Sequence, residues 1–324
     1  ATARPCARTG YQTGGTALPM SSKAVEEETC RQHGRDEALG DFTPGSISTI
    51  IVSWNVRERL RRCLDALRRS TLSSEIIVVD NASRDGSPEM VADEYADVCL
   101  LRNNANLGFA RAVNQGLAIA RSDYVLLLNP DTEVQPDTLA RLAAYLTAHP
   151  NVAAAGPIIR NPDGQVDLEG GRHLATPWNQ ALDWIGLSRH WPRLARHLLP
   201  DWDHQTTRPV ACLTGACVLL RRTALTQVEA LDPAYFLYGE DMDLFRRLAQ
   251  VGWQLIYCAE TEVLHHGSQS SRQVRFQAGL LALVNFQRFF RRHYGRRSAF
   301  LHRCLILPIV LGKGFVYSIC WLLA

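Results

Sequence analysis

Three carboxylates, Glu240, Asp241 and Asp243, fall within four positions of an otherwise apolar stretch. Like charges this close repel, so we expect the pKa of at least one of them to be raised toward the range in which a carboxylate can take up a proton. That is the chemistry of a general base. The same residues would also suit the first turn of a helix, where acidic side chains complement the helix dipole and the unpaired backbone N–H groups.

The elements that must position these residues follow from the hydrophobic pattern after position 46. Short runs rich in Val, Ile and Leu alternate with segments in which apolar residues recur at helical spacing. The pattern predicts strands over 48–54, 75–79, 98–102 and 124–128, and helices over 60–69, 88–95 and 110–121. This alternation is typical of βαβ units, and it predicts an α/β fold with a mostly parallel, Rossmann-like sheet and helices on both faces.

Polar residues follow each predicted strand. In open parallel sheets ligands bind beyond the carboxyl ends of the strands, near the point where the strand order reverses. The residues at these ends are Ser53 and Asn55, then Asp80, Asn81 and Ser83, then the segment 103–108, and then Asn129 and Asp131. Such residues favour turns in any protein, but four groups in one sheet, with few basic residues among them, predict a binding site.

The composition is that of a globular protein whose charge is unevenly divided. Of 324 residues, 46% are hydrophobic and 21% are charged, which excludes global disorder. The net charge is +3, yet the segment 263–324 contains eight Arg, Lys313 and no acidic residue. That segment therefore carries +9, which leaves −6 for the rest of the chain.

The two ends of the chain differ from its middle. Residues 1–45 mix Gly, Thr, Ser, Pro and charges without periodicity, so we expect a disordered leader, then a folded domain over 46–270 and a basic tail over 271–324. The nine cysteines are an odd number without a CxxC pair and predict neither a disulfide framework nor a zinc site. The N-terminal part lacks the apolar run of a signal peptide. These features favour a cytoplasmic protein.

Seven short motifs, in order along the chain, resemble the inverting family 2 glycosyltransferases with the GT-A fold, particularly the rhamnosyltransferase-like members. The matching segments are IIVSWN at 50–55, VVDNAS at 78–83, NLGFA at 106–110 with Asn114, LNPD at 128–131, TGA at 214–216, GEDMD at 239–243 and HHG at 265–267. Because these motifs extend from 47 to about 270, the resemblance implies a GT-A domain over 46–270.

The resemblance implies a site for the nucleotide of a sugar-nucleotide donor. The residues it assigns to this site are Ser53, Asn55, Asp80, Asn81, Ser83, Asn106, Gly108, Asn114 and Asn129. In that family the carboxylate after the second strand bonds the nucleobase, and here Asp80 would accept a hydrogen bond from the imide N–H that uracil and thymine carry and cytosine lacks. The alternative is that Asp80 caps a turn through Ser83.

The family's metal-binding motif is Asp-x-Asp, where this chain has Asn129-Pro130-Asp131. The resemblance implies that Asp131 and His265 still hold Mg²⁺ or Mn²⁺, together with the donor diphosphate and water. The ion would neutralise the leaving diphosphate. Because one carboxylate is missing, we expect weak metal binding in the absence of nucleotide. A single histidine is more often a structural hydrogen-bond partner, and only the family match favours the ligand role of His265.

Asp241 is the predicted catalytic base, with Glu240 as the second catalytic carboxylate. Inversion at an anomeric carbon needs one displacement, in which the base takes the proton of the acceptor hydroxyl. Glu240 would orient the base, and Asp243 would orient it or bind the acceptor. The residues expected on the acceptor side are Thr214, Gly215, Ala216 and Asp243, where small residues let the sugar approach the backbone. For the segment 214–216 the alternative is a tight turn before a strand over 217–220.

The tail interleaves eight Arg with aromatic residues over 272–303 and is almost continuously apolar over 304–324. Basic and aromatic residues together suit nucleic acid, but the apolar run favours lipid. We therefore expect an anionic membrane surface or a polyprenyl diphosphate head group as partner, and no nucleic acid. Pro308 and Lys313 argue against a membrane-spanning helix. A buried amphipathic helix or a dimer contact is the alternative.

These observations predict an inverting glycosyltransferase, attached peripherally to the inner face of the cell membrane, that transfers a sugar from a dTDP- or UDP-sugar to a lipid-linked or cell-envelope glycan. Rhamnose is the first candidate for the sugar. A nucleotidyltransferase is disfavoured, because the segment after the first strand lacks a Gly-rich loop with Lys or Arg. A non-catalytic nucleotide-sugar-binding or scaffold protein would not need Glu240, Asp241 and Asp131.

Overall fold

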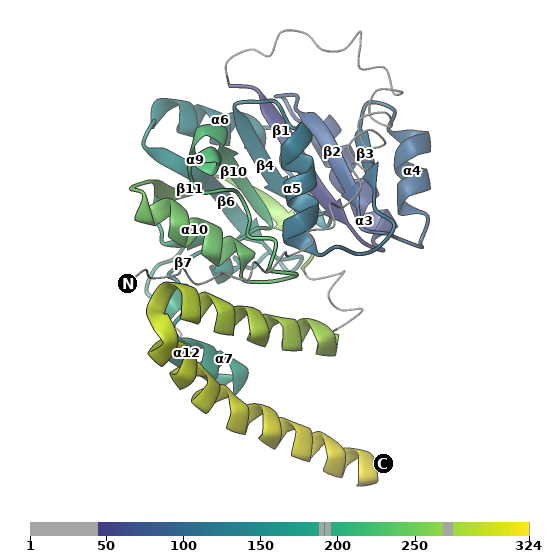
Figure 1. Ribbon diagram of the computed structural model, residues 1–324. Coiled ribbons are helices and arrows are strands. Elements are labelled where there is room, and N and C mark those ends of the chain that lie inside the picture. Colours follow the sequence, from purple (N-terminus) through teal and green to yellow (C-terminus); the bar gives the residue numbers. More distant parts are fainter. Residues whose placement is uncertain (1–44, 188–190, 192–195, 268–274, 324) are drawn as a thin grey trace, which may run out of the picture.

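The computed structural model describes residues 45–187, 191, 196–267 and 275–323, so all but the last position of the predicted leader lies outside the described residues. The described chain forms three layers, with one large sheet between two sets of helices (Figure 1). The sheet is mostly parallel in its first half, which confirms the predicted α/β class.

In the described residues, nine strands form the central sheet in the order β3-β2-β1-β4-β10-β6-β11-β5, with β8 paired to β11. Strands β1 to β4 run parallel, β11 is parallel to β6, and β5, β8 and β10 run antiparallel to their neighbours. The strand order reverses between β1 and β4, where a ligand site is expected. The bounds are β1 Ile47–Ser53, β2 Glu75–Asp80, β3 Cys99–Arg102, β4 Tyr124–Leu128, β5 Thr132–Val134, β6 Val152–Arg160, β8 Arg208–Pro209, β10 Cys217–Arg221 and β11 Gln254–His265.

Helices cover both faces of this sheet. Helices α3, α4 and α6 pack on one face, and α5, α9 and α10 pack on the other (Figure 1). The bounds are α3 Arg57–Arg68, α4 Ser87–Glu94, α5 Phe109–Ile119, α6 Thr138–Ala148, α7 Pro177–Trp184, α9 Arg222–Gln227, α10 Glu240–Gln250 and α12 Arg275–Leu323, with short 3-10 turns at Leu168–Gly170 and Arg196–Leu198.

The parallel strands are continuous apolar runs because both of their faces are buried. In β1, Ile50 packs on the face covered by α5 and α10, and the next residue, Ile51, packs on the face covered by α3 and α6. Ile77 and Val78 of β2 divide in the same way. Alternate residues of one strand thus build two separate cores.

The seven strands and helices predicted from the pattern are all present, with bounds shifted by at most three residues. The strand predicted over 217–220 is also present as β10. Its direction was not predicted: β10 lies antiparallel between β4 and β6. This insertion places the turn that precedes β10 next to the carboxyl end of β4.

A second, two-stranded sheet pairs β7 (Gly171–Arg172) with β9 (Cys212–Leu213). It lies close against the main sheet, since a Cβ atom on Gly171 would approach the ring of Tyr257 to 2.6 Å. Glycine at 171 therefore permits a contact that brings the next residue, Arg172, toward α10.

The C-terminal helix α12 consists of two helical segments that meet at Gly295 (φ 84°, ψ 176°). The first segment buries Phe289 and Phe290 completely in the main core, and the second turns away from the domain (Figure 1). The predicted helical extension is confirmed, but its first segment belongs to the core because these two aromatic side chains pack there. Among the described residues, no helix is long and apolar enough to cross a membrane.

Candidate active site

The loops after β1 and β2 are joined by hydrogen bonds at the predicted donor edge. Ser53 and Asp80 are register partners at the ends of the two strands, and the N–H of Asn81 donates to the carbonyl of Ser53 at 2.8 Å. The N–H of Asn55 donates to Ser83 Oγ at 2.9 Å. The structure therefore brings together the five residues predicted here for the donor nucleotide.

Asp80 uses only one of its carboxylate oxygens within the described chain. It is 2% exposed, and its Oδ2 accepts from the N–H of Ser83 at 2.9 Å, so it does cap this turn. Its Oδ1 is buried and has no hydrogen-bond partner among the described residues. Burial raises the pKa of Asp80 in spite of the hydrogen bonds from Ser83. A buried acceptor without a donor suits a ligand N–H.

The loop after β3 joins this edge to a distant segment. Asn106 accepts from the N–H of Gly108 at 3.0 Å. Gly108 has φ 85°, and a Cβ atom there would lie 2.6 Å from the carbonyl oxygen of Phe236, which in turn accepts from the N–H of Phe109 at 2.7 Å. The close backbone contact with the loop that precedes α10 therefore requires glycine at 108. The contact of Gly108 with the donor stays a prediction.

Asn114 lies on α5, more than one helix turn beyond this loop, and its side chain bonds to a different segment. Its Nδ2 donates to the carbonyl of Leu231 at 2.7 Å, and its Oδ1 accepts from the N–H of the same residue at 3.3 Å. Asn114 therefore holds the segment after α9 in place. The structure does not bring it together with the other residues predicted for the donor nucleotide.

The predicted metal ligands face each other. Antiparallel pairing of β5 with β11 sets His265 opposite Thr132, so that His265 Nε2 lies 3.3 Å from Asp131 Oδ1 and 3.5 Å from Asn129 Nδ2. The neighbouring His266 contacts Glu133 instead, at 2.8 Å. The structure thus favours His265 over His266 for the site.

Two protein ligands fit a cation that is shared with a substrate. The described residues contain no group of three or more His, Cys, Asp and Glu side chains able to hold an ion. Mg²⁺ and similar ions are commonly bound by one or two protein groups together with substrate phosphates and water. The Asp131–His265 pair is therefore consistent with a site completed by a diphosphate.

The segment 214–216 lies against the metal pair. The carbonyl of Ala216 accepts from the N–H of Asn129 at 2.9 Å and from Thr132 Oγ1 at 3.3 Å. Thr214 Oγ1 accepts from the N–H of Ala216 at 3.4 Å, which is the predicted tight turn. A Cβ atom on Gly215 would meet nothing within 4 Å, so packing does not require glycine there and the position faces open space. Both interpretations of this segment agree with its geometry.

The three carboxylates of the first turn of α10 point in different directions. Successive residues of a helix are rotated by about 100°, and residues three apart share a face. Glu240 and Asp243 accordingly face inward, with exposed fractions of 7% and 0%, whereas the side chain of Asp241 is 20% exposed. Asp241 is therefore the one that can reach an acceptor.

Glu240 has the raised pKa that the sequence predicted for this group. Burial, and then the charge of Asp241, raises the pKa of Glu240 to about 8, and its Oε2 has no hydrogen-bond partner among the described residues. A carboxyl group in this state is mostly protonated at pH 7. Two adjacent carboxylates with different surroundings are typical of active sites that use general acid–base catalysis.

Arg172 is the site residue that the sequence analysis missed. Its Nη2 lies 3.5 Å from Asp241 Oδ2, and its Nη1 donates to the carbonyl of Leu213 at 3.3 Å. The pair is mostly buried, with side-chain exposures of 13% and 20%. Arg172 thus orients the predicted base. In the sequence, only the two glycines before Arg172 mark this position. They do not indicate that Asp241 is its partner.

Asp243 does not have the acceptor-binding role predicted for it. Its Oδ2 accepts from Arg247 Nε at 2.7 Å, its Oδ1 accepts from His293 Nε2 at 2.8 Å, and Arg292 Nη1 lies 3.3 Å away. Burial alone would raise the pKa of Asp243, but these partners outweigh it and hold the pKa below its usual value. A carboxylate with no exposed surface cannot contact an acceptor.

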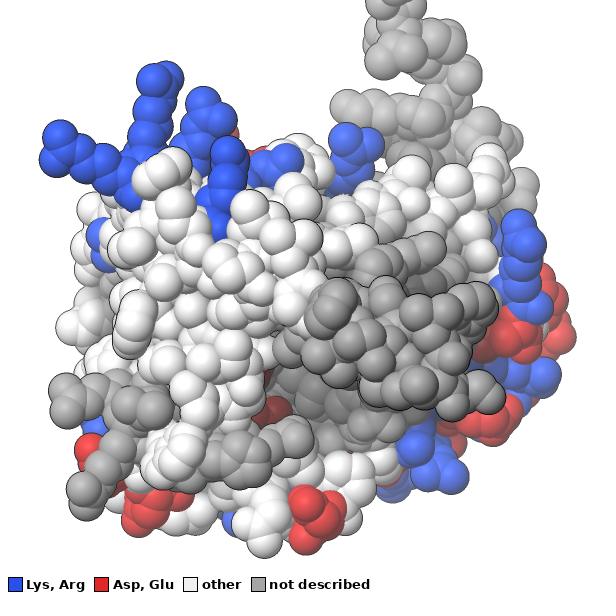
Figure 2. Space-filling view, turned by 90° about the horizontal axis from the view of Figure 1, so that it is seen from below, with Lys and Arg blue, Asp and Glu red and all other residues white. Residues whose placement is uncertain are grey.

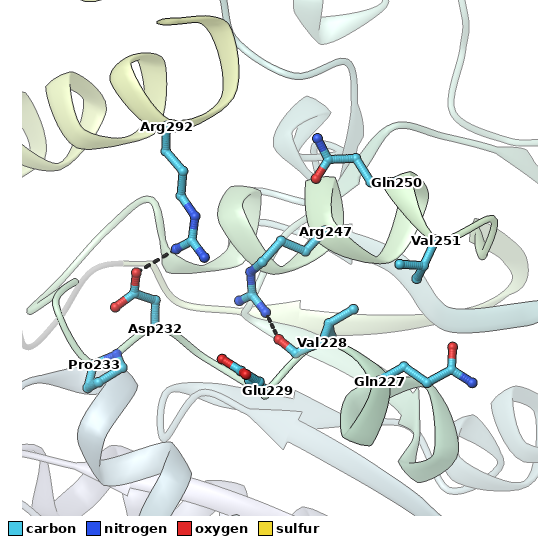
Figure 3. A pocket seen from close by; sticks show the side chains of 9 residues that line it. All are labelled: Gln227, Val228, Glu229, Asp232, Pro233, Arg247, Gln250, Val251 and Arg292. Atoms are coloured by element: carbon cyan, nitrogen blue, oxygen red, sulfur yellow. Dashed lines mark hydrogen bonds and ion pairs between the residues drawn. The ribbon is translucent and has the colours of Figure 1, made fainter.

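A pocket of about 440 Å³ lies beside the other end of α10 (Figure 3). Its described lining includes none of the residues predicted for the site. The lining residues are Gln227, Val228, Glu229, Asp232, Pro233, Arg247, Gln250, Val251 and Arg292. The chemistry considered above therefore belongs to the strand ends and not to this pocket.

The fold is that of a glycosyltransferase. Residues 48–228 match the family model "Glycosyl transferase family 2", and the chain belongs to that family, as its motifs predicted. The match ends before α10, so it includes Asp80 and Asp131 but not Asp241 or His265.

One relative is N-acetylglucosaminyl-diphospho-decaprenol L-rhamnosyltransferase of Mycobacterium tuberculosis, which is 32% identical to this chain over 248 residues, spanning 69% of this chain and 77% of the relative. The similarity to a rhamnosyltransferase is therefore confirmed.

Two solved structures are similar to the whole domain. The mannosyltransferase of Pyrobaculum calidifontis in complex with GDP-Man and Mn²⁺ has a TM-score of 0.53 and 17% identity, covering 92% of this chain and 89% of its own. GalNAc-T7 with UDP, GalNAc and Mn²⁺ has a TM-score of 0.52 and 18% identity, and the match covers 68% of this chain and 43% of GalNAc-T7. These likenesses confirm the predicted GT-A fold.

Proposed function

We propose that this glycosyltransferase is an inverting enzyme that transfers a sugar, with L-rhamnose from dTDP-rhamnose as the first candidate, to a polyprenyl-diphosphate-linked glycan. The observation behind the proposal is that two groups lie at strand ends of the main sheet, and that a third lies on the first turn of α10, whose preceding loop is hydrogen-bonded to the start of α5 through Phe109 and Phe236. They are Asp80 with its unpartnered oxygen, the Asp131–His265 pair, and Asp241 beside Arg172. Each group suits one part of the reaction: recognition of the nucleobase, binding of the diphosphate, and removal of a proton.

Donor binding follows from the first two groups. Asp80 Oδ1 would accept the imide N–H of thymine or uracil, and Ser53, Asn55 and Ser83 surround it on the adjoining loops. Asp131 and His265 would hold Mg²⁺ or Mn²⁺ together with the diphosphate; the two solved neighbours described above contain Mn²⁺. A divalent ion there supplies charge neutralisation for the leaving nucleoside diphosphate.

Transfer requires one displacement. Asp241 takes the proton of the acceptor hydroxyl, whose oxygen bonds to the anomeric carbon while the bond from that carbon to the diphosphate oxygen breaks. Arg172 orients Asp241. Glu240, mostly protonated at pH 7 because its pKa is about 8, adds little second negative charge beside the base. Attack opposite the leaving group inverts the anomeric configuration.

The acceptor assignment rests on the relative from Mycobacterium tuberculosis, whose name specifies N-acetylglucosaminyl-diphospho-decaprenol and L-rhamnose. The open position at Gly215, next to the metal pair, would let a sugar hydroxyl approach the donor. An acceptor linked to a polyprenyl diphosphate also requires the enzyme to work at a lipid surface.

The surface formed by α7 and the second segment of α12 suits such a lipid surface. Seen from the side on which these helices lie, the middle of the described face is largely free of charged side chains; several Lys and Arg project along one margin, and charged side chains of both signs lie at the other margins (Figure 2). Large apolar side chains are exposed on these helices, and they include Trp178, Ile185 at the end of α7, Phe300, Leu301, Leu307 and Leu311. We infer peripheral attachment to the anionic inner face of the cell membrane, without a role for nucleic acid.

A panel of nucleotide sugars tests the catalytic proposal. The purified full chain is incubated with dTDP-rhamnose, UDP-sugars or GDP-sugars, with and without Mn²⁺, and with N-acetylglucosaminyl-diphospho-polyprenol as acceptor. We expect metal-dependent transfer from dTDP-rhamnose with inversion, determined from the anomeric configuration of the product. Donor binding without transfer to this or related acceptors would favour a binding protein, and retention of configuration would exclude the single displacement.

Vesicle flotation tests the membrane proposal. The full chain should float with vesicles that contain anionic lipid, and deletion of residues 304–324 should release it while donor hydrolysis persists. Replacing the exposed Arg291, Arg296 and Arg297 with Gln should weaken flotation and reduce its dependence on salt. If the full chain stays unbound at every lipid composition, these helices have another role.

A further inference from the structure

The first segment of α12 presents a row of polar side chains to the loop 232–239, which leads into α10. Asn285 Nδ2 donates to the carbonyl of Leu237 at 2.8 Å, and Arg288 Nη1 donates to the carbonyl of Ala234. Arg292 Nη1 lies 2.6 Å from Asp232 Oδ2. These side chains recur at the spacing of one helix face, so a single face of α12 contacts this loop at its start, middle and end.

Two further contacts run from this face to α10 and across the pocket. His293 Nε2 donates to Asp243 Oδ1 at 2.8 Å, and Tyr235 contacts the same oxygen at 3.5 Å. Figure 3 shows Arg292 reaching from α12 to Asp232, while Arg247 reaches from α10 to the carbonyl of Val228. The first turn of α10 is therefore anchored from the side opposite to the substrate.

The loop needs such anchoring because its last two residues adopt left-handed backbone conformations. Tyr238 has φ 68° and Gly239 has φ 91°, directly before the predicted catalytic residues. For a residue with a bulky side chain this conformation is unfavourable, and it persists only where surrounding contacts hold it. The same loop also touches the donor edge, through the bond from Phe109 to Phe236.

We propose that Asn285 and His293 are positioning residues for sugar transfer: by holding the loop 232–239 and Asp243, they set the place of Asp241 relative to the donor edge. The proposal rests on the function proposed above. It divides α12 by role, since the first segment holds the loop that leads to α10 and the second turns away from the domain. Burial of Phe289 and Phe290 is a separate, structural contribution of the same segment.

The test uses His293→Ala and Asn285→Ala in the full chain. We expect kcat for transfer to fall about 10–100-fold, the range for a small misplacement of a catalytic group, with an unchanged Kd for the nucleoside diphosphate. His293→Gln should recover much of the rate, because its side-chain N–H can still donate to Asp243. The matched control is Val284→Ala, an exposed apolar position on the same segment, which should keep the wild-type kcat.

A double-mutant cycle separates positioning from a general loss of stability. If His293 acts through Asp241, adding His293→Ala to an Asp241→Asn variant should cause little further loss of rate. A further loss as large as in the wild-type background, or a wild-type kcat in both alanine variants, would overturn the proposal.

Hydrogen exchange provides a readout that does not depend on activity. Backbone amides of 234–239 should exchange faster in both alanine variants than in the wild type, while those of β1 and β2 stay unchanged. Unchanged exchange at 234–239 would also overturn the proposal. Absence of transfer by the wild type would instead contradict the proposed function, and the exchange measurement would still decide whether the anchoring exists.

Discussion

The donor edge and the acceptor edge of this site are held in different ways. At the donor edge, Asp80 is fixed by a residue three positions away and by register with Ser53 on the adjacent strand. At the acceptor edge, the first turn of α10 is fixed by Arg172 from the small second sheet and by His293, which lies 50 residues beyond Asp243. The family model covers the first edge and ends before α10. Local turn chemistry therefore shapes the predicted donor edge, and tertiary contacts between distant segments shape the predicted acceptor edge.

The two edges also differ in how carboxylates are kept buried. Asp80 is buried with one oxygen unpartnered in the described chain, which suits a ligand donor. Asp243 is buried among the protein's own donors, Arg247, His293 and Arg292, which suits a structural role. Burial of a carboxylate alone does not indicate its function, whereas the source of its hydrogen-bond donors does.

The largest expected effect separates chemistry from donor binding. Asp241→Asn should lower kcat by about 10²–10⁴-fold, because it removes a proton acceptor and keeps the shape of the side chain. The Kd of the donor should change little. Single-turnover transfer and calorimetry measure the two quantities, and Asp93→Asn, an exposed carboxylate on α4, is the control. Wild-type turnover in Asp241→Asn would place the base elsewhere.

Asp131→Ala should abolish the dependence of donor binding on Mn²⁺, since it removes the carboxylate that faces His265. Calorimetric titration of the nucleoside diphosphate with and without Mn²⁺ measures the effect. Glu133→Ala is the matched control, because Glu133 contacts His266 and not His265. A full metal response in Asp131→Ala would show that Asp131 is a turn residue and that any ion binds at another place.

Asp80→Ala should weaken binding of UDP and dTDP by about 1.5–3 kcal/mol, the range for a hydrogen bond to a charged group. The preference of the wild type for UDP over CDP should disappear as well, since cytosine has no imide N–H. Asp85→Ala is the control on the same loop, where the carboxylate accepts from Arg57 and Ser87. An unchanged Kd in Asp80→Ala would mean that the base binds in another place.

The last expected effect is on stability and leaves substrate binding aside. The pKa of Glu240 is about 8 in the folded chain and near 4.5 when unfolded, so between these values the folded state binds more protons and its stability falls as the pH rises. The slope for one proton is at most about 1.4 kcal/mol per pH unit. Glu240→Gln removes this dependence and should gain stability relative to the wild type from pH 5 to 8. Denaturant unfolding at several pH values measures the free energy of unfolding of both proteins. If the difference between them did not change with pH, Glu240 would not be buried in its protonated form.

The parts of the predicted site that the structure brings together are those encoded in short segments. The residues at the ends of β1 and β2 and the pairing of Asp131 with His265 lie where the motifs implied, because turn residues and neighbouring strands leave little freedom for their placement. The raised pKa in the carboxylate group was also predicted, but its location at Glu240 was not. Asp243, which was expected to orient the base or bind the acceptor, is completely buried, and Arg172 was missed.

The sequence by itself determined the order of strands and helices, the polar strand ends and the presence of closely spaced carboxylates, because periodicity and turn preferences act over a few residues. Only the tertiary structure decided which of the three carboxylates is partly exposed and which two are buried. That choice depends on the rotation of α10, and the rotation is set by α12, by the left-handed residues Tyr238 and Gly239, and by the glycine contact that places Arg172. These contacts join segments far apart in the chain, and no local pattern specifies their partners.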